Sequence, residues 1–222
     1  MYKIFNVTLD RGGRGFMKDG IQRLSKYERK DIKIDGQDVC IFDYSGFEPS
    51  LCYTMCQEVF EGDDYYDISY FDGWEGYDKK VLRNVCKLAL LIMFNTHDRR
   101  SAHKAINEVL AKEFDVPTLY KEGKIPSKTI PIKDILDDME KKHHVVMHKF
   151  YVGFGAELQY AGSLIIDYIT DYMMQTHKCL VLSVFDECIT KEDFREELYS
   201  AMVDAYETIL GFSDNCKITV EQ

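Results

Sequence analysis

The sequence predicts an α+β fold in which packed helices cover an antiparallel β-sheet. Two apolar runs predict the sheet: residues 39–42 end at Asp43, and residues 180–185 end at Asp186 with a second short run after it. Between these runs, apolar residues recur at the spacing of one helix face. The resulting order is a strand, several helices, a strand pair and a last helix.

Each further element has a local signal. Residues 1–33 are expected to be irregular or extended, since the glycines of 11–15 permit a tight turn. Residues 115–132 hold three of the four prolines and are expected to be a connector. The helices are expected at 49–60, 79–95, 101–114, 133–150 and 157–175, with a last one that starts at 190–193 and ends at Gly211.

The composition is that of an ordinary globular chain. With 222 residues and 45% hydrophobic content, it can bury a core within one domain. The seven cysteines lack paired metal-ligand spacing, which favours reduced thiols in a cytoplasmic compartment. We expect no membrane association, because no apolar run approaches spanning length.

The charge distribution is uneven. A net charge of −10 argues against nucleic-acid binding by the chain as a whole. However, residues 1–33 hold nine Lys and Arg against four acids, and residues 79–104 hold seven against one. Residues 57–78 carry eight acids and no basic residue, and we expect a solvated loop with packed tyrosines there. A basic track on an acidic body therefore remains open.

Asp43 and Asp186 are the strongest candidates for chemistry. If the two apolar runs are neighbouring strands, these carboxylates converge at one edge of the sheet. Two converging carboxylates suit a pair of divalent cations that hold the phosphates of a nucleotide. The alternative interpretation is an ordinary solvated turn after each strand.

The first run continues as Asp43-Tyr44-Ser45-x-x-Glu48, which resembles motif A of family A DNA polymerases and, more loosely, of phage-type single-subunit RNA polymerases. The resemblance implies that Asp43 binds both cations. It implies that the Tyr44 carbonyl faces the second cation and that Tyr44 and Ser45 lie beside the nucleotide. It also implies that Glu48 crowds a ribose 2′-hydroxyl and so favours deoxynucleotides.

The second run ends in Phe185-Asp186-Glu187, which resembles motif C of the same family, with its His-Asp-Glu core. The resemblance implies that Asp186 binds metal and that Glu187 assists. Phe185 departs from the motif, because phenylalanine cannot donate the hydrogen bond of the family's histidine.

Arg83 and Lys87 resemble the cationic pair of the family's fingers helix. Their spacing of four places both on one helix face, from which both can reach one triphosphate. The family's aromatic positions hold Leu91 and Asn95 here, so we expect Phe94, which returns to nearly the same face, to supply the stacking surface. The alternative is a solvated basic face.

Four residues are expected to contact nucleic acid. Gly13-Arg14, with Gln22 and Arg29, is similar to the family's Gly-Arg element before motif A. Gln159 opens the helix before motif C, as does the family's template-contacting glutamine. The elements follow the family's order over most of the chain.

Together these features imply a minimal stand-alone polymerase palm over 1–222, with 79–132 as a small fingers-like subdomain. The expected activity is template-directed addition of dNTPs to a 3′-hydroxyl with two Mg²⁺ or Mn²⁺ ions. The expected partners are a primer-template, nucleoside triphosphates and a processivity or replication partner. Since no thumb precedes Arg14, we expect low processivity.

Two alternatives come from other classes. The departures at Phe185 and in the fingers helix suit a catalytically weak or inactive palm that binds nucleic acid or a replication partner. The same carboxylates also suit a metal-dependent nuclease or phosphodiesterase. The Tyr-rich, Pro-poor composition suggests a phage or mobile-element origin.

Overall fold

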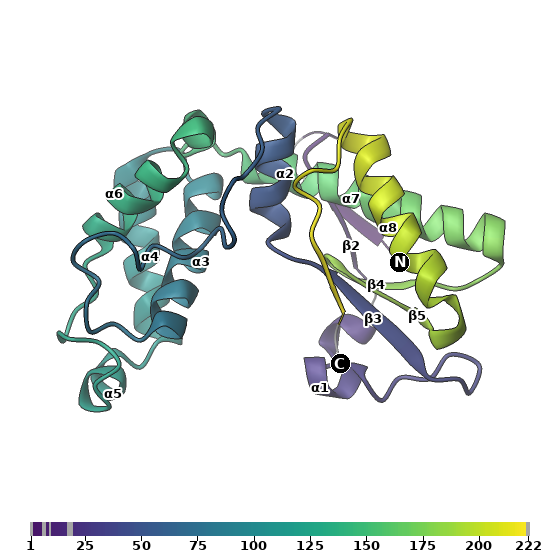
Figure 1. Cartoon of the computed structure of the whole chain (residues 1–222), viewed down its shortest axis with the longest axis horizontal. Coiled ribbons are helices and arrows are strands. Elements are labelled where there is room, and N and C mark those ends of the chain that lie inside the picture. Colours follow the sequence, from purple (N-terminus) through teal and green to yellow (C-terminus); the bar gives the residue numbers. More distant parts are fainter. Residues whose placement is uncertain (1, 6–7, 9, 17–19, 221–222) are drawn as a thin grey trace. The chain divides into compact units, whose positions relative to one another are not determined.

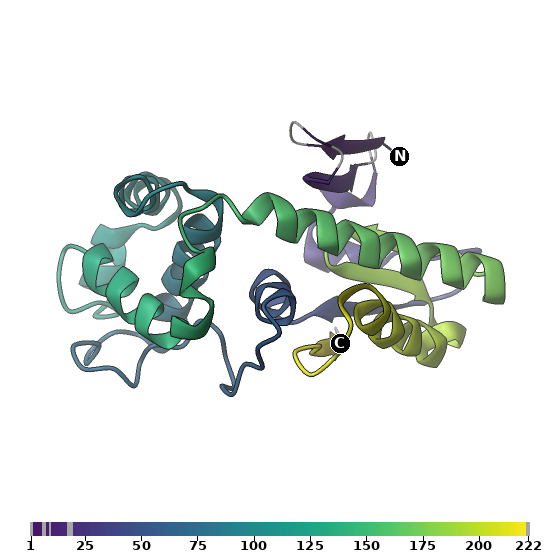
Figure 2. The same cartoon turned by 90° about the horizontal axis from the view of Figure 1, so that it is seen from above.

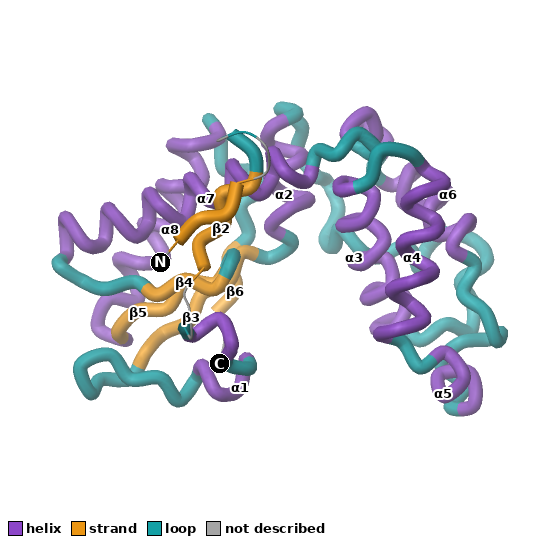
Figure 3. Tube along the Cα trace, turned by 180° about the vertical axis from the view of Figure 1, so that it is seen from behind, coloured by secondary structure: helices purple, strands orange, loops and turns teal. Residues whose placement is uncertain are grey.

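A computed structural model describes residues 2–5, 8, 10–16 and 20–220 (Figure 1). The chain divides into two compact units, which we call the sheet unit (1–60 and 156–222) and the helical unit (61–155). Figure 3 shows the strands, in orange, gathered in the sheet unit. The predicted α+β class with an antiparallel sheet is confirmed.

The sheet unit contains six described strands and four helices. The strands are β1 (Tyr2–Phe5), β2 (Gly12–Phe16), β3 (Val39–Tyr44), β4 (Leu182–Val184), β5 (Glu187–Lys191) and β6 (Ile218–Val220). The helices are α1 (Lys26–Arg29), α2 (Phe47–Met55), α7 (Gly155–Tyr172), which continues as a π-helical turn (Met173–His177), and α8 (Arg195–Leu210).

Strand β3 lies inside a four-stranded sheet of order β4-β5-β3-β6, in which each neighbouring pair is antiparallel. The Tyr44 side chain lies on the face of β3 that packs against α8. Its hydroxyl donates to the Met202 carbonyl of α8 at 2.6 Å. Because side chains alternate along a strand, Asp43 turns to the other face. The register sets Asp43 opposite Glu187.

The N-terminal segment forms a β-hairpin, which fits the extended alternative of the prediction. Strands β1 and β2 pair antiparallel, and Figure 2 shows them alongside α7. Two ion pairs hold the hairpin to α7: Lys3 with Asp167, and Arg11 with Glu157 at 3.2 Å. Gly13 has a φ of +83°, and a Cβ there would lie 2.7 Å from the Ser163 hydroxyl oxygen. Only glycine fits this contact.

Two helix ends in the sheet unit have clear backbone causes. Helix α2 ends at Met55, earlier than predicted, because the chain turns at Gln57 with a φ of 59°. Helix α8 ends at Gly211, as predicted, with a left-handed φ of 93°. A left-handed residue after the last turn is the common way to end a helix.

The helical unit contains α3 (Lys79–Asn95), α4 (Arg99–Glu113), α5 (Val116–Lys121) and α6 (Ile132–Lys142). It spans 61–155, wider than the predicted subdomain 79–132. The acidic segment before α3 belongs to this unit because its aromatic residues enter the core. Trp74 donates its indole N–H to Asp138 of α6 at 2.8 Å, and the Tyr65 carbonyl lies 2.9 Å from Nε2 of His143.

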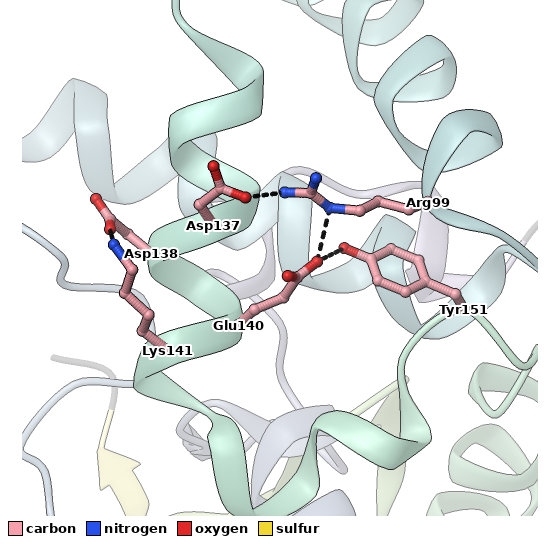
Figure 4. Close-up of polar contacts among 6 residues, drawn as sticks. All are labelled: Arg99, Asp137, Asp138, Glu140, Lys141 and Tyr151. Atoms are coloured by element: carbon pink, nitrogen blue, oxygen red, sulfur yellow. Dashed lines mark hydrogen bonds and ion pairs between the residues drawn. The ribbon is translucent and has the colours of Figure 1, made fainter.

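A polar cluster joins α4, α6 and the segment after α6 (Figure 4). Arg99 of α4 pairs with Asp137 and donates from Nε to Glu140 at 2.8 Å. The Tyr151 hydroxyl donates to the same Glu140 oxygen at 2.7 Å. Burial raises the pKa of Tyr151, so the phenol stays a donor. The cluster therefore fixes three segments of the helical unit to one another.

Within the described part of the chain, no helix combines the length and apolar character required to cross a membrane.

His143 gives the helical unit a pH-dependent stability. Its ring is fully buried, and burial lowers its pKa to about 4. In the unfolded chain a histidine protonates near 6.5. Between these two values only the unfolded state takes the proton. The contribution of the neutral His143 ring to the free energy of unfolding is therefore fully present above pH 6.5. It falls by about 3 kcal/mol on acidification to pH 4. Denaturant titrations at pH 7, 5.5 and 4 measure this loss.

The control separates His143 from the other titrating groups. His143→Gln is expected to be less stable at pH 7 and to lose less of its stability than the wild type on acidification. His148→Gln changes an exposed histidine of the same segment and should keep the wild-type slope. An unchanged slope in His143→Gln would refute the assignment.

Candidate active site

The structure brings Asp43 and Asp186 to the same end of adjacent strands, as predicted. Asp43 lies on β3 opposite Glu187, and Asp186 precedes Glu187 in the turn between β4 and β5. The Tyr44 N–H donates to the Asp186 carbonyl at 3.3 Å, which holds the turn against the end of β3. Backbone pairing therefore fixes the neighbourhood of the two aspartates.

The carboxylates at this end of the sheet act on a common neighbour. Burial raises the pKa of the Cys188 thiol, and the negative charges of Asp186, Glu187 and Asp43 raise it further. The site thus concentrates negative potential beside a neutral, buried thiol. A concentration of carboxylate charge at a strand end is what a divalent cation requires.

Glu187 pairs with Arg29 inside the sheet unit. Its carboxylate forms a two-point ion pair with Arg29, with Nε to Oε1 at 2.7 Å and Nη2 to Oε2 at 3.1 Å. The side chains of Arg29 and Glu187 are only 14% and 6% exposed. Arg29 also donates to the Leu24 carbonyl at 2.7 Å. Each side chain thus offsets the charge of the other inside the fold. The predictions that Glu187 assists catalysis and that Arg29 contacts nucleic acid stay predictions.

A cavity of about 240 Å³ opens beside Asp186 within the sheet unit. Its walls come from α7, the segment leading through β4, and Gly13 and Gly15 of the hairpin. Glu48 and Gln159 line it together with Asp186. Two residues singled out for nucleotide and template contacts therefore share one concave surface with a predicted metal ligand.

Phe185 forms part of the same cavity and is half-exposed. Its φ of 60° is a left-handed conformation that costs a non-glycine residue about 1 kcal/mol or more. The two-residue turn between β4 and β5 imposes this conformation. The turn thus presents an apolar ring next to Asp186, where the family motif has an imidazole.

Tyr44 can face a ligand chiefly through its backbone, whereas Ser45 is partly exposed. The Tyr44 ring is buried, stacked on Phe47 at 4.7 Å between centroids, and burial raises the pKa of its hydroxyl. The Ser45 N–H donates to the Lys217 carbonyl at 2.7 Å. The predicted use of the Tyr44 carbonyl is compatible with this arrangement and stays a prediction.

Arg83 and Lys87 lie on one face of α3, as their spacing predicts. Both approach the ring of Tyr66, with the Arg83 guanidinium carbon at 5.1 Å and the Lys87 Nζ at 5.9 Å from its centroid. Arg83 also pairs through Nε with Asp64 at 2.5 Å. The helical unit therefore presents two cations in a defined arrangement.

Phe94 does not supply the predicted stacking surface. Its side chain is 1% exposed and lies edge-on to Phe150, 5.5 Å between centroids. Eleven residues past Arg83, it returns to within about 20° of the same helical direction. However, the segment containing Phe150 covers α3 at that level. The position of Phe94 around the helix axis could not predict that another segment would bury it.

The remaining nucleic-acid candidates lie in or near the hairpin. Gln22 donates to the Gly15 carbonyl at 2.8 Å, which supports β2. Arg14 lies on β2 opposite Ile4, and its side chain falls outside the described part of the structure. Their contacts with nucleic acid stay predictions.

Sequence reasoning missed two residues beside the cations, Asp64 and Tyr66. Both lie in the acidic segment expected to be a solvated loop. Their only local signal was an aspartate two residues before a tyrosine, which suits a side-chain-capped turn. Nothing in that signal indicated which helix the turn would meet.

The donor set fits magnesium with substrate phosphates. Among the described residues, no three His, Cys, Asp or Glu side chains form a metal-binding group. Asp43 and Asp186 supply two carboxylates, and Mg²⁺ is commonly held by one or two carboxylates plus phosphates and water. The site thus suits ions that arrive with a nucleotide.

Comparison with known proteins gives distant structural likenesses. No protein-family model and no curated protein matches the chain. Among solved structures, it is similar to the POL domain of Pol1 from M. smegmatis in complex with DNA primer-template and dNTP, with a TM-score of 0.42 and 15% identity. The match covers 90% of this chain and 43% of that chain, so the chain spans less than half of that structure. A likeness of this size assigns no activity.

The Arg29–Glu187 pair yields a stability prediction. Arg29→Met leaves the Glu187 carboxylate buried without its cation, and we expect a loss of about 3 kcal/mol in the free energy of unfolding. Arg29→Met with Glu187→Leu removes both charges and should recover most of that loss. Urea denaturation measures both variants. A cost below about 1 kcal/mol for Arg29→Met would show that the pair contributes little.

Proposed function

We propose that the chain is a template-directed nucleotidyltransferase that adds deoxynucleotides to a 3′-hydroxyl. The observation that carries the proposal is the register of β3 with β5, which sets Asp43 beside the turn that holds Asp186. The cavity next to Asp186 supports it, because Glu48 and Gln159 line the same surface. The partners in this proposal are a primer-template and nucleoside triphosphates.

Asp43 and Asp186 are the residues that would hold two Mg²⁺ or Mn²⁺ ions. Such ions, when bound, lower the pKa of an attacking hydroxyl and offset charge on the phosphates. Within the helical unit, Arg83 offers a planar guanidinium and Lys87 a point charge, which are groups that suit a triphosphate.

Glu48 and Gln159 determine which substrate the cavity accepts. A glutamate side chain that crowds the sugar leaves no room for a 2′-hydroxyl group, so Glu48 supports a preference for deoxynucleotides. Gln159 offers both a donor and an acceptor, which suits the edge of a base or a sugar. Phe185 adds an apolar surface at the mouth of this cavity.

Primer extension tests the two aspartates. Asp43→Asn and Asp186→Asn keep the side-chain shape but remove one ligand charge each, so we expect at least a 100-fold loss of dNTP incorporation. Asp38→Asn is the matched control, since Asp38 is an exposed aspartate just before the other end of β3, paired with Lys33. It should incorporate dNTPs at the wild-type rate. Activity near wild type in either site variant would refute the metal assignment.

A second candidate function is a non-catalytic palm that binds nucleic acid. The commitment of Glu187 to Arg29 favours it, because the third acid of the motif is then withdrawn from the site. In this case the chain would bind a primer-template but not extend it. Extension assays with deoxy- and ribonucleotides, alongside DNA-binding measurements, separate the two functions.

Thermal unfolding with added Mg²⁺ or Mn²⁺ tests ion binding without activity. At ten times the dissociation constant, a bound ion adds about 1.4 kcal/mol of stability, which raises the Tm by about 3–6 °C in a chain of this size. Asp186→Asn should lose this shift and Asp38→Asn should keep it. A wild-type Tm that does not respond to either ion, even with dNTP present, would argue for the non-catalytic function.

A further inference from the structure

Asp64 is the immediate counter-ion of Arg83 in the helical unit. Its Oδ2 lies 2.5 Å from Arg83 Nε. The two side chains are 28% and 44% exposed, so the pair lies at the surface, where an anion from solvent can reach it. A guanidinium has five N–H donors, and this carboxylate engages it at the Nε edge.

The backbone holds Asp64 in this position. Its second oxygen, Oδ1, accepts a hydrogen bond from the Tyr66 N–H at 3.0 Å. The carboxylate thus caps its own turn with one oxygen and pairs with Arg83 through the other. A counter-ion anchored in this way occupies the cation without the entropy cost of ordering a long side chain.

The same turn delivers the ring of Tyr66 to both cations. The ring is buried and lies 5.1 Å from the Arg83 guanidinium carbon and 5.9 Å from Lys87 Nζ. A cation near an aromatic ring is attracted by its quadrupole. Arg83 and Lys87 are therefore held by the ring independently of Asp64, and removal of the carboxylate charge leaves them in place.

We propose that Asp64 is a built-in competitor for the polyphosphate that binds at Arg83 and Lys87. Binding of a triphosphate displaces Asp64 Oδ2 from Arg83 Nε, while the turn and the Tyr66 ring keep the two cations together. The identity of the ligand as a nucleoside triphosphate rests on the proposed function. A competitor of one negative charge yields to a ligand of several, so the pair selects triphosphate over inorganic phosphate.

Calorimetric titration of the full chain with inorganic triphosphate tests the competition without template or activity. Asp64→Asn removes the charge but keeps Oδ1 as an acceptor for the Tyr66 N–H. We expect it to tighten triphosphate binding at least fivefold and to reduce the preference for triphosphate over inorganic phosphate. Asp63→Asn removes the same charge from the exposed neighbouring residue and should change the affinity less than twofold.

A double variant links the gain to Arg83. Asp64→Asn with Arg83→Gln should lose the gain, because the released guanidinium is then absent. Unchanged thermal unfolding of each variant excludes a misfolded helical unit.

The outcomes separate this inference from the proposed function. If Arg83→Gln weakens triphosphate binding but Asp64→Asn matches Asp63→Asn or binds more weakly than the wild type, the competitor role is refuted and the phosphate site stands. If neither Arg83→Gln nor Lys87→Gln changes the affinity, the phosphate site itself is refuted, and the competitor role with it. Absence of measurable binding in both the wild type and Asp64→Asn would also overturn the inference.

Discussion

The antiparallel register between β3 and β5 determines where Asp43, Asp186 and Glu187 lie. Side chains alternate along a strand, so a shift of one residue would send Asp43 to the α8 face and Tyr44 to the site. Two contacts prevent that shift. The Tyr44 hydroxyl donates to the Met202 carbonyl on one face, and its N–H donates to the Asp186 carbonyl at the turn. The buried aromatic residue next to the aspartate is thus what places the carboxylate.

The three acids at this end of the sheet differ in how their negative charges are stabilised. Glu187 is nearly enclosed, and a buried carboxylate requires a nearby cation, which Arg29 provides through a hydrogen bond from Nη2 and a charge contact from Nε. Asp43 and Asp186 are partly exposed, so water contributes to the solvation of their charges. The buried ion pair therefore concerns Glu187 and not the two aspartates. Burial and the nearby carboxylates raise the pKa of the Cys188 thiol, so this neighbour stays neutral.

The sequence predicted the elements that depend on local signals. The apolar runs gave β3 and the β4–β5 hairpin, helical spacing gave α3 with Arg83 and Lys87 on one face, and Gly211 gave the end of α8. It did not predict features that depend on what meets a given face. The burial of Phe94 under Phe150, the pairing of Arg29 with Glu187 and the docking of the β1–β2 hairpin on α7 each join residues more than 50 positions apart. Periodicity carries no information about such partners.

The acidic segment before α3 shows how a strongly negative chain can still hold cations ready for an anion. Its acids are not all solvated: Asp64 caps a turn and pairs with Arg83. Trp74 of the same segment donates a hydrogen bond to Asp138 of α6. Intramolecular pairing of this kind keeps the cations of α3 from binding any passing anion at the low affinity of an exposed lysine or arginine. It also makes the response to an incoming ligand depend on the ligand's charge. Because the acid and the aromatic ring come from one turn, the fold can release the cation from its counter-ion without releasing it from its position.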